Sequence, residues 1–280
     1  MSFVTKRLSQ SQICLRIQNA SYFCIEKKDA DMKNIRISAF GDSVLKGTVL
    51  ESVNPLKYTL PENCFTDICS ASLGVRIDNF ARFGSTLDSG ERMLIRHMTG
   101  LRAYDFTLLE FGGNDCDYYW SAIAVDPQRR HLPNTPVTEF SIKYGKIVDR
   151  VRELGSSPVL LTLPPVEPVR YFSHITRDFS DEGRSNVLGW LGGTPDFIRE
   201  WHEMYNFRVL EMAAVKGVPA IDITSPFYSR PGYGKLLCED GAHPNAQGQE
   251  VMAGALENGL RKIIQERALE GLGGVKVAFC

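Results

Sequence analysis

Residues 35–43 read Ile-Arg-Ile-Ser-Ala-Phe-Gly-Asp-Ser, a short apolar run that ends in a polar turn. A run of this kind followed by glycine is typical of a strand that enters a tight turn. Residues 106–115 show the same pattern, an apolar run that ends in a polar turn, and read Phe-Thr-Leu-Leu-Glu-Phe-Gly-Gly-Asn-Asp. Because the apolar run of this second stretch is almost continuous, it predicts a strand that is covered on both faces.

Along the rest of the chain, strand-like runs alternate with segments of helical periodicity. The further strand candidates are Val75–Phe80, Val159–Leu163 and Ala220–Thr224. Apolar residues recur at three- and four-residue spacing in the helix candidates, which lie around residues 88–98, 140–154, 197–213 and 252–264. Such alternation requires crossover connections, so it predicts one parallel sheet between two layers of helices.

We expect one domain over residues 34–270, with an extension at each end. Residues 1–33 contain two apolar runs on either side of a polar turn, Ile13–Ile17 and Tyr22–Ile25, which predicts a hairpin. The tail, residues 271–280, alternates over 275–279 in a way that predicts a further strand.

Two long segments do not follow the alternation of strands and helices. Residues 116–137 and 164–193 come after the third and fourth predicted strands. We expect both to be loops, and loops of this length usually carry function or are disordered. They begin at the edge of the sheet where active sites of such folds lie.

The composition excludes several classes of protein. The chain has 280 residues, 43% of them hydrophobic, and its 32 Lys and Arg residues nearly balance its 33 Asp and Glu residues. This balance removes the general electrostatic case for a nucleic-acid partner. No run approaches the roughly 18 apolar residues that are needed to cross a bilayer. We therefore expect neither nucleic-acid binding nor membrane insertion.

The cysteines and the first residues bear on the cellular compartment. The seven cysteines are an odd and scattered set without a Cys-x-x-Cys pair, which favours free thiols over a disulfide framework. The first 33 residues lack the uninterrupted apolar core of a secretory signal. Both observations predict a cytoplasmic protein.

Residues that carry chemistry follow the predicted strands, at the edge where parallel sheets bind their ligands. Ser43 follows the first strand, Gly84 the second and Asn114 the third. Asp240 and His243 come after the fifth strand in the sequence Asp-Gly-Ala-His. A hydroxyl, a glycine turn, a carboxamide, a carboxylate and an imidazole therefore converge at one edge, as acyl transfer by a nucleophilic serine requires.

These residues closely resemble the four sequence blocks of the SGNH hydrolases, the GDSL-type esterase and lipase family. The blocks read Gly41-Asp42-Ser43, Gly84, Gly112-Gly113-Asn114-Asp115 and Asp240-Gly241-Ala242-His243, in the family's order. The resemblance covers residues 34–269, and Val44 stands where the family's name has leucine. It implies a three-layer α/β/α, flavodoxin-like sandwich with a five-stranded parallel sheet, for which we expect the strand order 2-1-3-4-5.

The resemblance also implies a role for each residue. Ser43 would attack the acyl carbonyl, His243 would take the proton, and Asp240 would orient the imidazole. The oxyanion hole would use the backbone N–H groups of Ser43 and Gly84 and the side-chain amide of Asn114. Neither a metal ion nor an organic cofactor is needed for this reaction.

Each of these residues also has a structural alternative. Asp42 and Ser43 could only cap a helix, and Gly84 could be a plain turn residue. Asn114 and Asp115 could form an Asx turn. The combination of all four blocks favours the catalytic interpretation.

We expect the other histidines and several cysteines to be structural. This group comprises His97, His131, His174, His202, Cys64, Cys69 and Cys116. The histidines have no metal-ligand spacing among themselves, so no metal site is predicted. Residues 41–48 resemble a phosphate-binding loop, but lysine and glycine are transposed, which argues against a nucleotide site.

The substrate is less well defined by the sequence. Aromatic residues gather in the two long segments, at Tyr118, Tyr119, Trp120, Tyr171, Phe172 and Trp190. Aromatic rings beside an esterase site suit sugars, so we expect a small-molecule ester, in particular an O-acetylated carbohydrate. These rings could also only pack the loops. A lysophospholipase or thioesterase that acts on lipids, and a non-catalytic binding module, are the alternatives.

Overall fold

The centre of the computed structural model, which describes residues 12–17, 21–26 and 32–271, is a five-stranded sheet. Its strands are β3 (Arg36–Gly41), β6 (Arg76–Asn79), β7 (Phe106–Glu110), β8 (Ser157–Leu161) and β9 (Ala220–Ile221). They lie in the order β6-β3-β7-β8-β9, and every neighbouring pair is parallel. The predicted order 2-1-3-4-5 is therefore confirmed.

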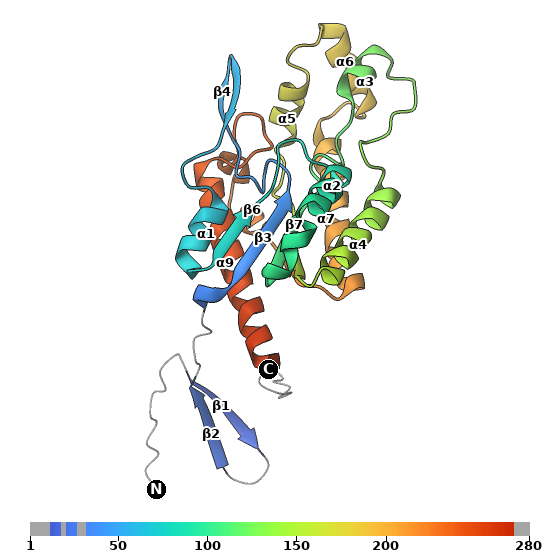
Figure 1. Cartoon of the computed structure of the whole chain (residues 1–280). Helices are drawn as coiled ribbons and strands as arrows, with labels where there is room; N and C mark the ends of the chain where they lie inside the picture. The colour runs from blue at the N-terminus through green and yellow to red at the C-terminus, as the bar shows by residue number, and fades with distance from the viewer. Residues whose placement is uncertain (1–11, 18–20, 27–31, 272–280) are drawn as a thin grey trace.

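Helices cover both faces of this sheet (Figure 1). One face packs against α1 (Phe65–Leu73) and α9 (Ala246–Gly271), and the other against α2 (Leu87–His97), α4 (Val137–Glu153) and α7 (Asp196–Lys216). In β3, the side chains of Ile37 and Ala39 pack in the hydrophobic core on the first of these faces, and that of Phe40 packs in the core on the second. Since both faces are covered, every residue of β7 is buried. The predicted three-layer sandwich is confirmed.

Three short helices stand where the two long loops were predicted. They are α3 (Trp120–Val125), α5 (Pro168–Ile175) and α6 (Asp181–Trp190), and they pack together around Ile123, Phe172 and Val187. Figure 1 shows them grouped at the end of the molecule toward which β3 points. Helices of six to ten residues have too few turns to show a clear period and depend on tertiary packing for stability. This is why the sequence pattern did not reveal them.

A second feature absent from the sequence prediction is an antiparallel hairpin of β4 (Val49–Val53) and β5 (Leu56–Thr59). It reaches the same end of the molecule as α3, α5 and α6 (Figure 1). The remaining short elements are α8 (Ser225–Tyr228) and the 3-10 helices η1 (Met32–Asn34), η2 (Met98–Ala103) and η3 (Tyr233–Leu236).

Near the amino terminus, β1 (Gln12–Ile17) and β2 (Ser21–Glu26) pair with each other in an antiparallel sheet. The strand predicted over residues 275–279 lies outside the described residues. The division into a domain of residues 34–270 and two extensions stays a prediction. Among the described residues, no helix combines the length and the apolar character needed to cross a bilayer.

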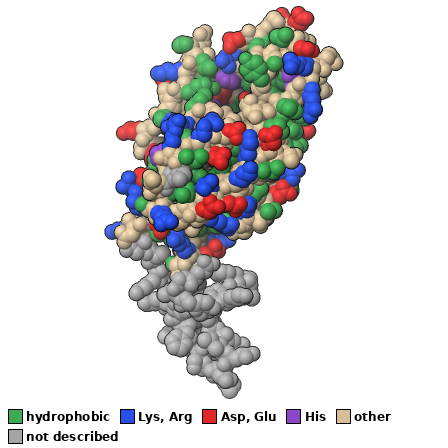
Figure 2. Space-filling model, turned by 45° about the vertical axis from the view of Figure 1, so that its right-hand side comes forward, with side chains coloured by type: hydrophobic (Ala, Val, Ile, Leu, Met, Phe, Trp, Pro, Cys, Tyr) green, Lys and Arg blue, Asp and Glu red, His purple; other side chains and the backbone are tan. Residues whose placement is uncertain are grey.

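The surface carries both signs of charge. Figure 2 shows basic and acidic side chains interspersed over the visible face, without a face of one sign in that view.

Candidate active site

Ser43 lies just beyond the end of β3, in the turn that follows Gly41. A Cβ at residue 41 would lie 2.5 Å from the carbonyl oxygen of Glu110, so only glycine lets β3 and β7 come this close. The serine is buried, with 5% of its surface exposed. Its Oγ lies 2.8 Å from Nε2 of His243, which is 200 residues away in the sequence. The structure therefore brings the predicted nucleophile and base into hydrogen-bond distance.

Asp240 holds the other side of the His243 ring. Its Oδ2 lies 2.7 Å from Nδ1 of His243, while its Oδ1 accepts the backbone N–H groups of Ala242 and His243 at 3.0 and 3.1 Å. Burial raises the pKa of Asp240, but its hydrogen bond with His243 and the charge of that residue outweigh burial and lower the pKa to about 2. Asp240 is therefore ionised throughout the neutral range and can stabilise a protonated imidazole.

The two other residues predicted for the oxyanion hole follow β6 and β7. Asn114 lines the same cavity as Ser43 and His243, and its Nδ2 donates to Oδ2 of Asp42 at 2.9 Å. Gly84 has a φ of 70°, a left-handed conformation that favours glycine, and a Cβ there would meet nothing within 4 Å. Backbone conformation rather than lack of space therefore favours glycine at position 84.

Asp115, beside Asn114, holds the loop after β7 in place. Its carboxylate accepts the backbone N–H of Leu87, the first residue of α2, at 3.0 and 3.2 Å, and the hydroxyl of Thr135 at 2.6 Å. Burial raises the pKa of Asp115 to about 6 against these hydrogen bonds. The residue caps α2 and so fixes the position of its neighbour Asn114.

Most of the chain also matches a known protein family. Residues 39–251 match the model of the GDSL-like lipase/acylhydrolase family. The chain belongs to this family. Membership confirms the resemblance predicted from the four blocks, together with the class of carboxylic ester hydrolases.

The chain is also similar to individual proteins. The chain is 24% identical over 152 residues to the GDSL esterase/lipase CPRD49 of Arabidopsis thaliana; the match covers 53% of this chain and 51% of the relative, so the chain spans about half of that relative's length. A lipase/acylhydrolase structure from Enterococcus faecalis has a TM-score of 0.57 at 18% identity, with 83% of this chain and 96% of that chain covered. A catalytic mutant of an acetylxylan esterase from Geobacillus stearothermophilus has a TM-score of 0.54 at 15% identity, with 82% and 96% covered. At these identities the structural likeness shows a common fold.

Behind the serine of this GDSL-type site lies a pair of buried carboxyl groups. Burial and the neighbouring Asp42 raise the pKa of Glu110, the last residue of β7, well above its usual range. Burial likewise raises the pKa of the neighbouring Asp42. Asp42 accepts the backbone N–H of Val44 at 2.8 Å and the amide of Asn114. This network orients the Asn114 side chain. The available sequence signal was an acidic residue within an otherwise apolar strand.

Tyr58, from the unpredicted hairpin, lies over the ring of His243. The two ring centroids are 5.0 Å apart, and the ring of Phe83 stacks on His243 at 5.9 Å and 9°. The Tyr58 hydroxyl donates to Oδ2 of Asp240 at 3.2 Å, and its oxygen lies 3.2 Å from Nε2 of His174. A hydrogen-bonded chain thus continues from Ser43 through His243 and Asp240 to Tyr58. The turn signal Asn54-Pro55 could have located this hairpin.

The remaining histidines divide into two groups. His97 lies against the rings of Phe40 and Phe80, and Nε2 of His131 contacts the carbonyl oxygen of Asp126 at 2.7 Å, so both lie in structural surroundings. His202, by contrast, lines the cavity beside Ser43. No group of three or more His, Cys, Asp or Glu side chains within the described part of the chain is arranged to hold a metal ion.

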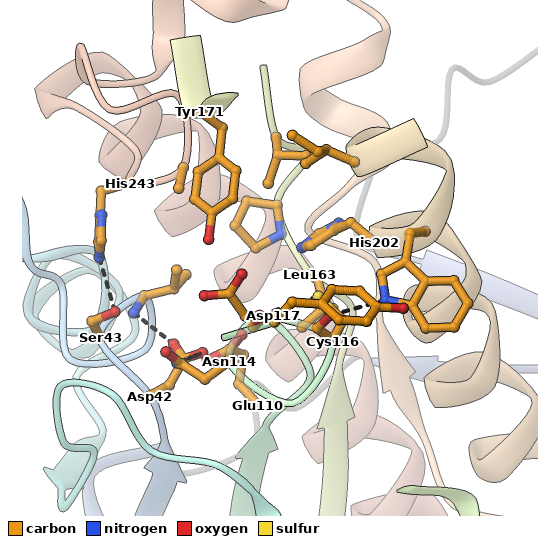
Figure 3. Close-up of a pocket in the computed structure, with 18 of the residues that line it drawn as sticks. Asp42, Ser43, Glu110, Asn114, Cys116, Asp117, Leu163, Tyr171, His202 and His243 are labelled. Atoms are coloured by element: carbon orange, nitrogen blue, oxygen red, sulfur yellow. Dashed lines mark hydrogen bonds between the residues drawn. The ribbon is translucent and has the colours of Figure 1, made fainter. Parts of the chain in front are cut away.

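The cavity beside Ser43 has a volume of about 110 Å³ (Figure 3). Three of the aromatic residues singled out in the sequence line it, namely Tyr118, Trp120 and Tyr171. The other three lie elsewhere: Phe172 and Trp190 pack among α3, α5 and α6, and Tyr119 is exposed. Cys116 lines the cavity, and its thiol donates to the carbonyl oxygen of Gly113. Cys64 and Cys69 are buried away from it.

Proposed function

We propose that this GDSL-type chain is a serine ester hydrolase that works through an acyl-enzyme. The observation that carries the proposal is the continuous contact from Ser43 Oγ to His243 Nε2 at 2.8 Å and from His243 Nδ1 to Asp240 at 2.7 Å. A serine hydroxyl is a weak nucleophile until a neighbouring base takes its proton, and this arrangement supplies that base together with a carboxylate that orients it.

The reaction then follows from the positions of these groups. Ser43 attacks the ester carbonyl while His243 accepts the hydroxyl proton, and Asp240 stabilises the resulting imidazolium. His243 returns the proton to the leaving alcohol. Water next attacks the acyl-enzyme with His243 again as the base, which releases the acid and restores Ser43.

The proposed oxyanion hole stabilises the negative charge of the tetrahedral intermediate. It consists of the backbone N–H groups of Ser43 and Gly84 and the side chain of Asn114. The Asn114 amide has two hydrogens, and the hydrogen bond to Asp42 uses one of them. The second is free to donate to the oxyanion. Asp42 supports this role because its hydrogen bond holds the amide in place before substrate binds.

For the substrate we propose short acyl esters, in particular O-acetyl groups on carbohydrates. The cavity of about 110 Å³ is smaller than the roughly 150 Å³ that holds one benzene molecule, so it suits an acyl group of a few atoms. Tyr118, Trp120 and Tyr171 provide the aromatic surfaces that sugars pack against. The acetylxylan esterase with a similar fold has a substrate of this kind by its name. A lysophospholipase or thioesterase needs a long apolar groove instead.

The test is a panel of esters with acyl groups from acetyl to decanoyl, together with acetylated sugars. We expect the highest kcat/KM for acetyl and propionyl esters, release of acetate from the sugars, and a loss of at least about 10⁴-fold in Ser43→Ala. Ser121→Ala, on the exposed surface of α3, is the matched control and should keep full activity. Activity that rises steadily toward decanoyl would favour the lipid alternative, and an active Ser43→Ala would refute the mechanism.

We also propose a cytoplasmic location, which the free thiols of Cys64, Cys69, Cys116 and Cys238 support. Cell fractionation tests it: the protein should be found with cytoplasmic markers. Recovery with secreted or envelope proteins would contradict it.

A further inference from the structure

The cavity beside Ser43 contains a buried acid that the proposed reaction does not use. Asp117 lies three positions after Asn114, in the loop after β7, and lines the cavity. Its Oδ1 accepts the indole N–H of Trp120 at 2.7 Å, and the hydroxyl of Tyr171 donates a second hydrogen bond to the carboxylate. Figure 3 shows the Asp117 carboxylate at the centre of the cavity, with the Tyr171 hydroxyl directed toward it. The backbone N–H of Tyr118 is a third donor. Three donors still leave acceptor capacity on a carboxylate, which has about four lone-pair sites.

A second buried polar group enters the same cavity from α7. His202 is 6% exposed, and its Nδ1 has no hydrogen-bond partner among the described residues. Figure 3 shows the ring extending from its helix toward Asp117. Burial lowers the pKa of His202 to about 4, so the imidazole is neutral at neutral pH. A buried nitrogen without a partner is unfavourable, which indicates that a further group completes the hydrogen bonds of this site.

The walls of the cavity are apolar apart from these groups and the catalytic end. Trp120, Trp201 and Tyr118 contribute aromatic surface, and Leu163 and Ile198 contribute aliphatic surface. A purely aliphatic chain would fill this space but would leave Nδ1 of His202 without a partner and would leave the remaining acceptor capacity of Asp117 unused. Such a mismatch strongly disfavours the apolar ligand.

We propose that this cavity is a specificity subsite for a small hydroxyl-bearing group, whose hydroxyl donates to Asp117. This inference rests on the proposed ester hydrolase function and defines its substrate further. A hydroxyl both donates and accepts, so it matches a carboxylate that needs a donor and an imidazole nitrogen that can take either role. An ammonium group only donates hydrogen bonds. It therefore satisfies Asp117 but cannot accept a hydrogen bond from a protonated nitrogen of His202.

The hydroxyl has two possible sources, because either side of the ester could enter the cavity. It belongs to the acyl group in a hydroxyacyl ester, and to the alcohol in a partly acetylated sugar or polyol. Two isosteric pairs of substrates separate these sources. Glycolyl and propionyl esters of one alcohol differ only in hydroxyl against methyl on the acyl side. 2-Hydroxyethyl acetate and propyl acetate differ in the same way on the alcohol side.

The measurement is the ratio of kcat/KM within each pair, for the wild type and for Asp117→Leu and Asp117→Asn. Dividing the wild-type ratio by the variant ratio removes the intrinsic reactivity of the two esters. In one of the two pairs, we expect Asp117→Leu to lower the preference for the hydroxyl-bearing ester by about 10- to 100-fold, the range of a hydrogen bond to a charged acceptor. Asp117→Asn should lower it less, because the amide oxygen still accepts. Asp126→Asn, an exposed acid at the end of α3, is the matched control and should change neither ratio.

The outcomes separate this inference from the proposed function. If neither ratio changes in either variant while wild type and variants still hydrolyse propyl acetate, the function stands and the hydroxyl subsite is wrong. A marked preference for acetylcholine over its uncharged isostere, 3,3-dimethylbutyl acetate, that Asp117→Leu removes would replace the hydroxyl by a cation and also refute the inference. Wild-type protein without activity on any of these esters would refute the proposed function itself.

Discussion

The two sides of Ser43 differ in how their polar groups are satisfied. On one side, both ring nitrogens of His243 and both carboxylate oxygens of Asp240 have hydrogen-bond partners, and the pKa of Asp240 falls to about 2. On the other side, burial raises the pKa of Asp117 to about 6, and Nδ1 of His202 has no partner among the described residues. The first side is therefore complete before substrate binds, whereas the second is incomplete. Catalysis benefits from preorganised groups, and selectivity benefits from groups that only the right ligand satisfies.

The largest effect is expected from a change on the complete side. Asp240→Asn keeps the shape of the residue but removes the charge that sets the tautomer and orientation of His243. We expect kcat/KM for a short ester to fall by about 10⁴-fold, with the fold unchanged by circular dichroism. Asp88→Asn, in the first turn of α2, is the control and should retain activity. A loss below about tenfold would mean that Asp240 does not orient the base.

The next largest effect concerns the boundary between the two sides. Asn114→Ala removes one proposed oxyanion donor and leaves Ser43, His243 and Asp240 in place. We expect kcat to fall by about 10²- to 10³-fold, equivalent to about 2.7–4 kcal/mol of transition-state stabilisation, with KM little changed. Steady-state kinetics on a nitrophenyl acetate provides the measurement. An unchanged kcat would remove Asn114 from the oxyanion hole.

A smaller effect is expected at the outer end of the hydrogen-bonded chain. Tyr58→Phe keeps the ring against His243 but loses the hydroxyl that donates to Asp240. The loss of one hydrogen bond of roughly 1 kcal/mol should lower kcat by about three- to tenfold. Tyr104→Phe is a matched control, because Tyr104 also donates to an aspartate, Asp78, but outside the site. Equal effects of the two variants would show that Tyr58 has no positioning role.

The incomplete side should also reduce stability as the pH rises. Burial raises the pKa of Asp117 from 3.8 to about 6, so between these values the folded protein binds a proton that the unfolded chain has lost. This contribution to stability is fully present below about pH 4 and is lost as the pH rises through 6. Asp117→Asn abolishes this contribution. Between pH 4 and 7, the free energy of unfolding of the variant should therefore rise relative to that of the wild type by at most about 3 kcal/mol.

Urea unfolding of the wild type and Asp117→Asn at several pH values measures this difference. Asp126→Asn should follow the wild type over the whole range, because Asp126 is exposed. If the difference in unfolding free energy between Asp117→Asn and the wild type does not change with pH, burial does not raise the pKa of Asp117.

The complete side is also the side that the sequence predicts well. Its residues follow strands whose apolar runs are long enough to recognise: a strand was expected within residues 106–115, and β7 is found over Phe106–Glu110. Short blocks at strand ends bring their side chains to one edge by topology alone. Even here the bounds differ: a strand was expected over Ala220–Thr224, and β9 contains only Ala220 and Ile221.

The incomplete side escaped prediction because it depends on tertiary packing. His202 lies in α7, where its spacing is that of any core residue, and nothing local indicates that its ring reaches a cavity. Tyr171 lies in α5 and Trp120 in α3, two helices that pack in one cluster and were read as loops. Glu110 looked like an exception within an apolar strand, and only the fold shows that burial and the proximity of Asp42 raise the pKa of its carboxyl group.

The most direct test of the central claim is the site at which a fluorophosphonate probe reacts with the folded protein. The account predicts one covalent adduct, on Ser43 by peptide mass spectrometry, that is lost on heat denaturation and strongly slowed in His243→Ala. Absence of any adduct on Ser43 in folded, wild-type protein would contradict it, and would leave the GDSL-type fold without the catalytic serine proposed for it.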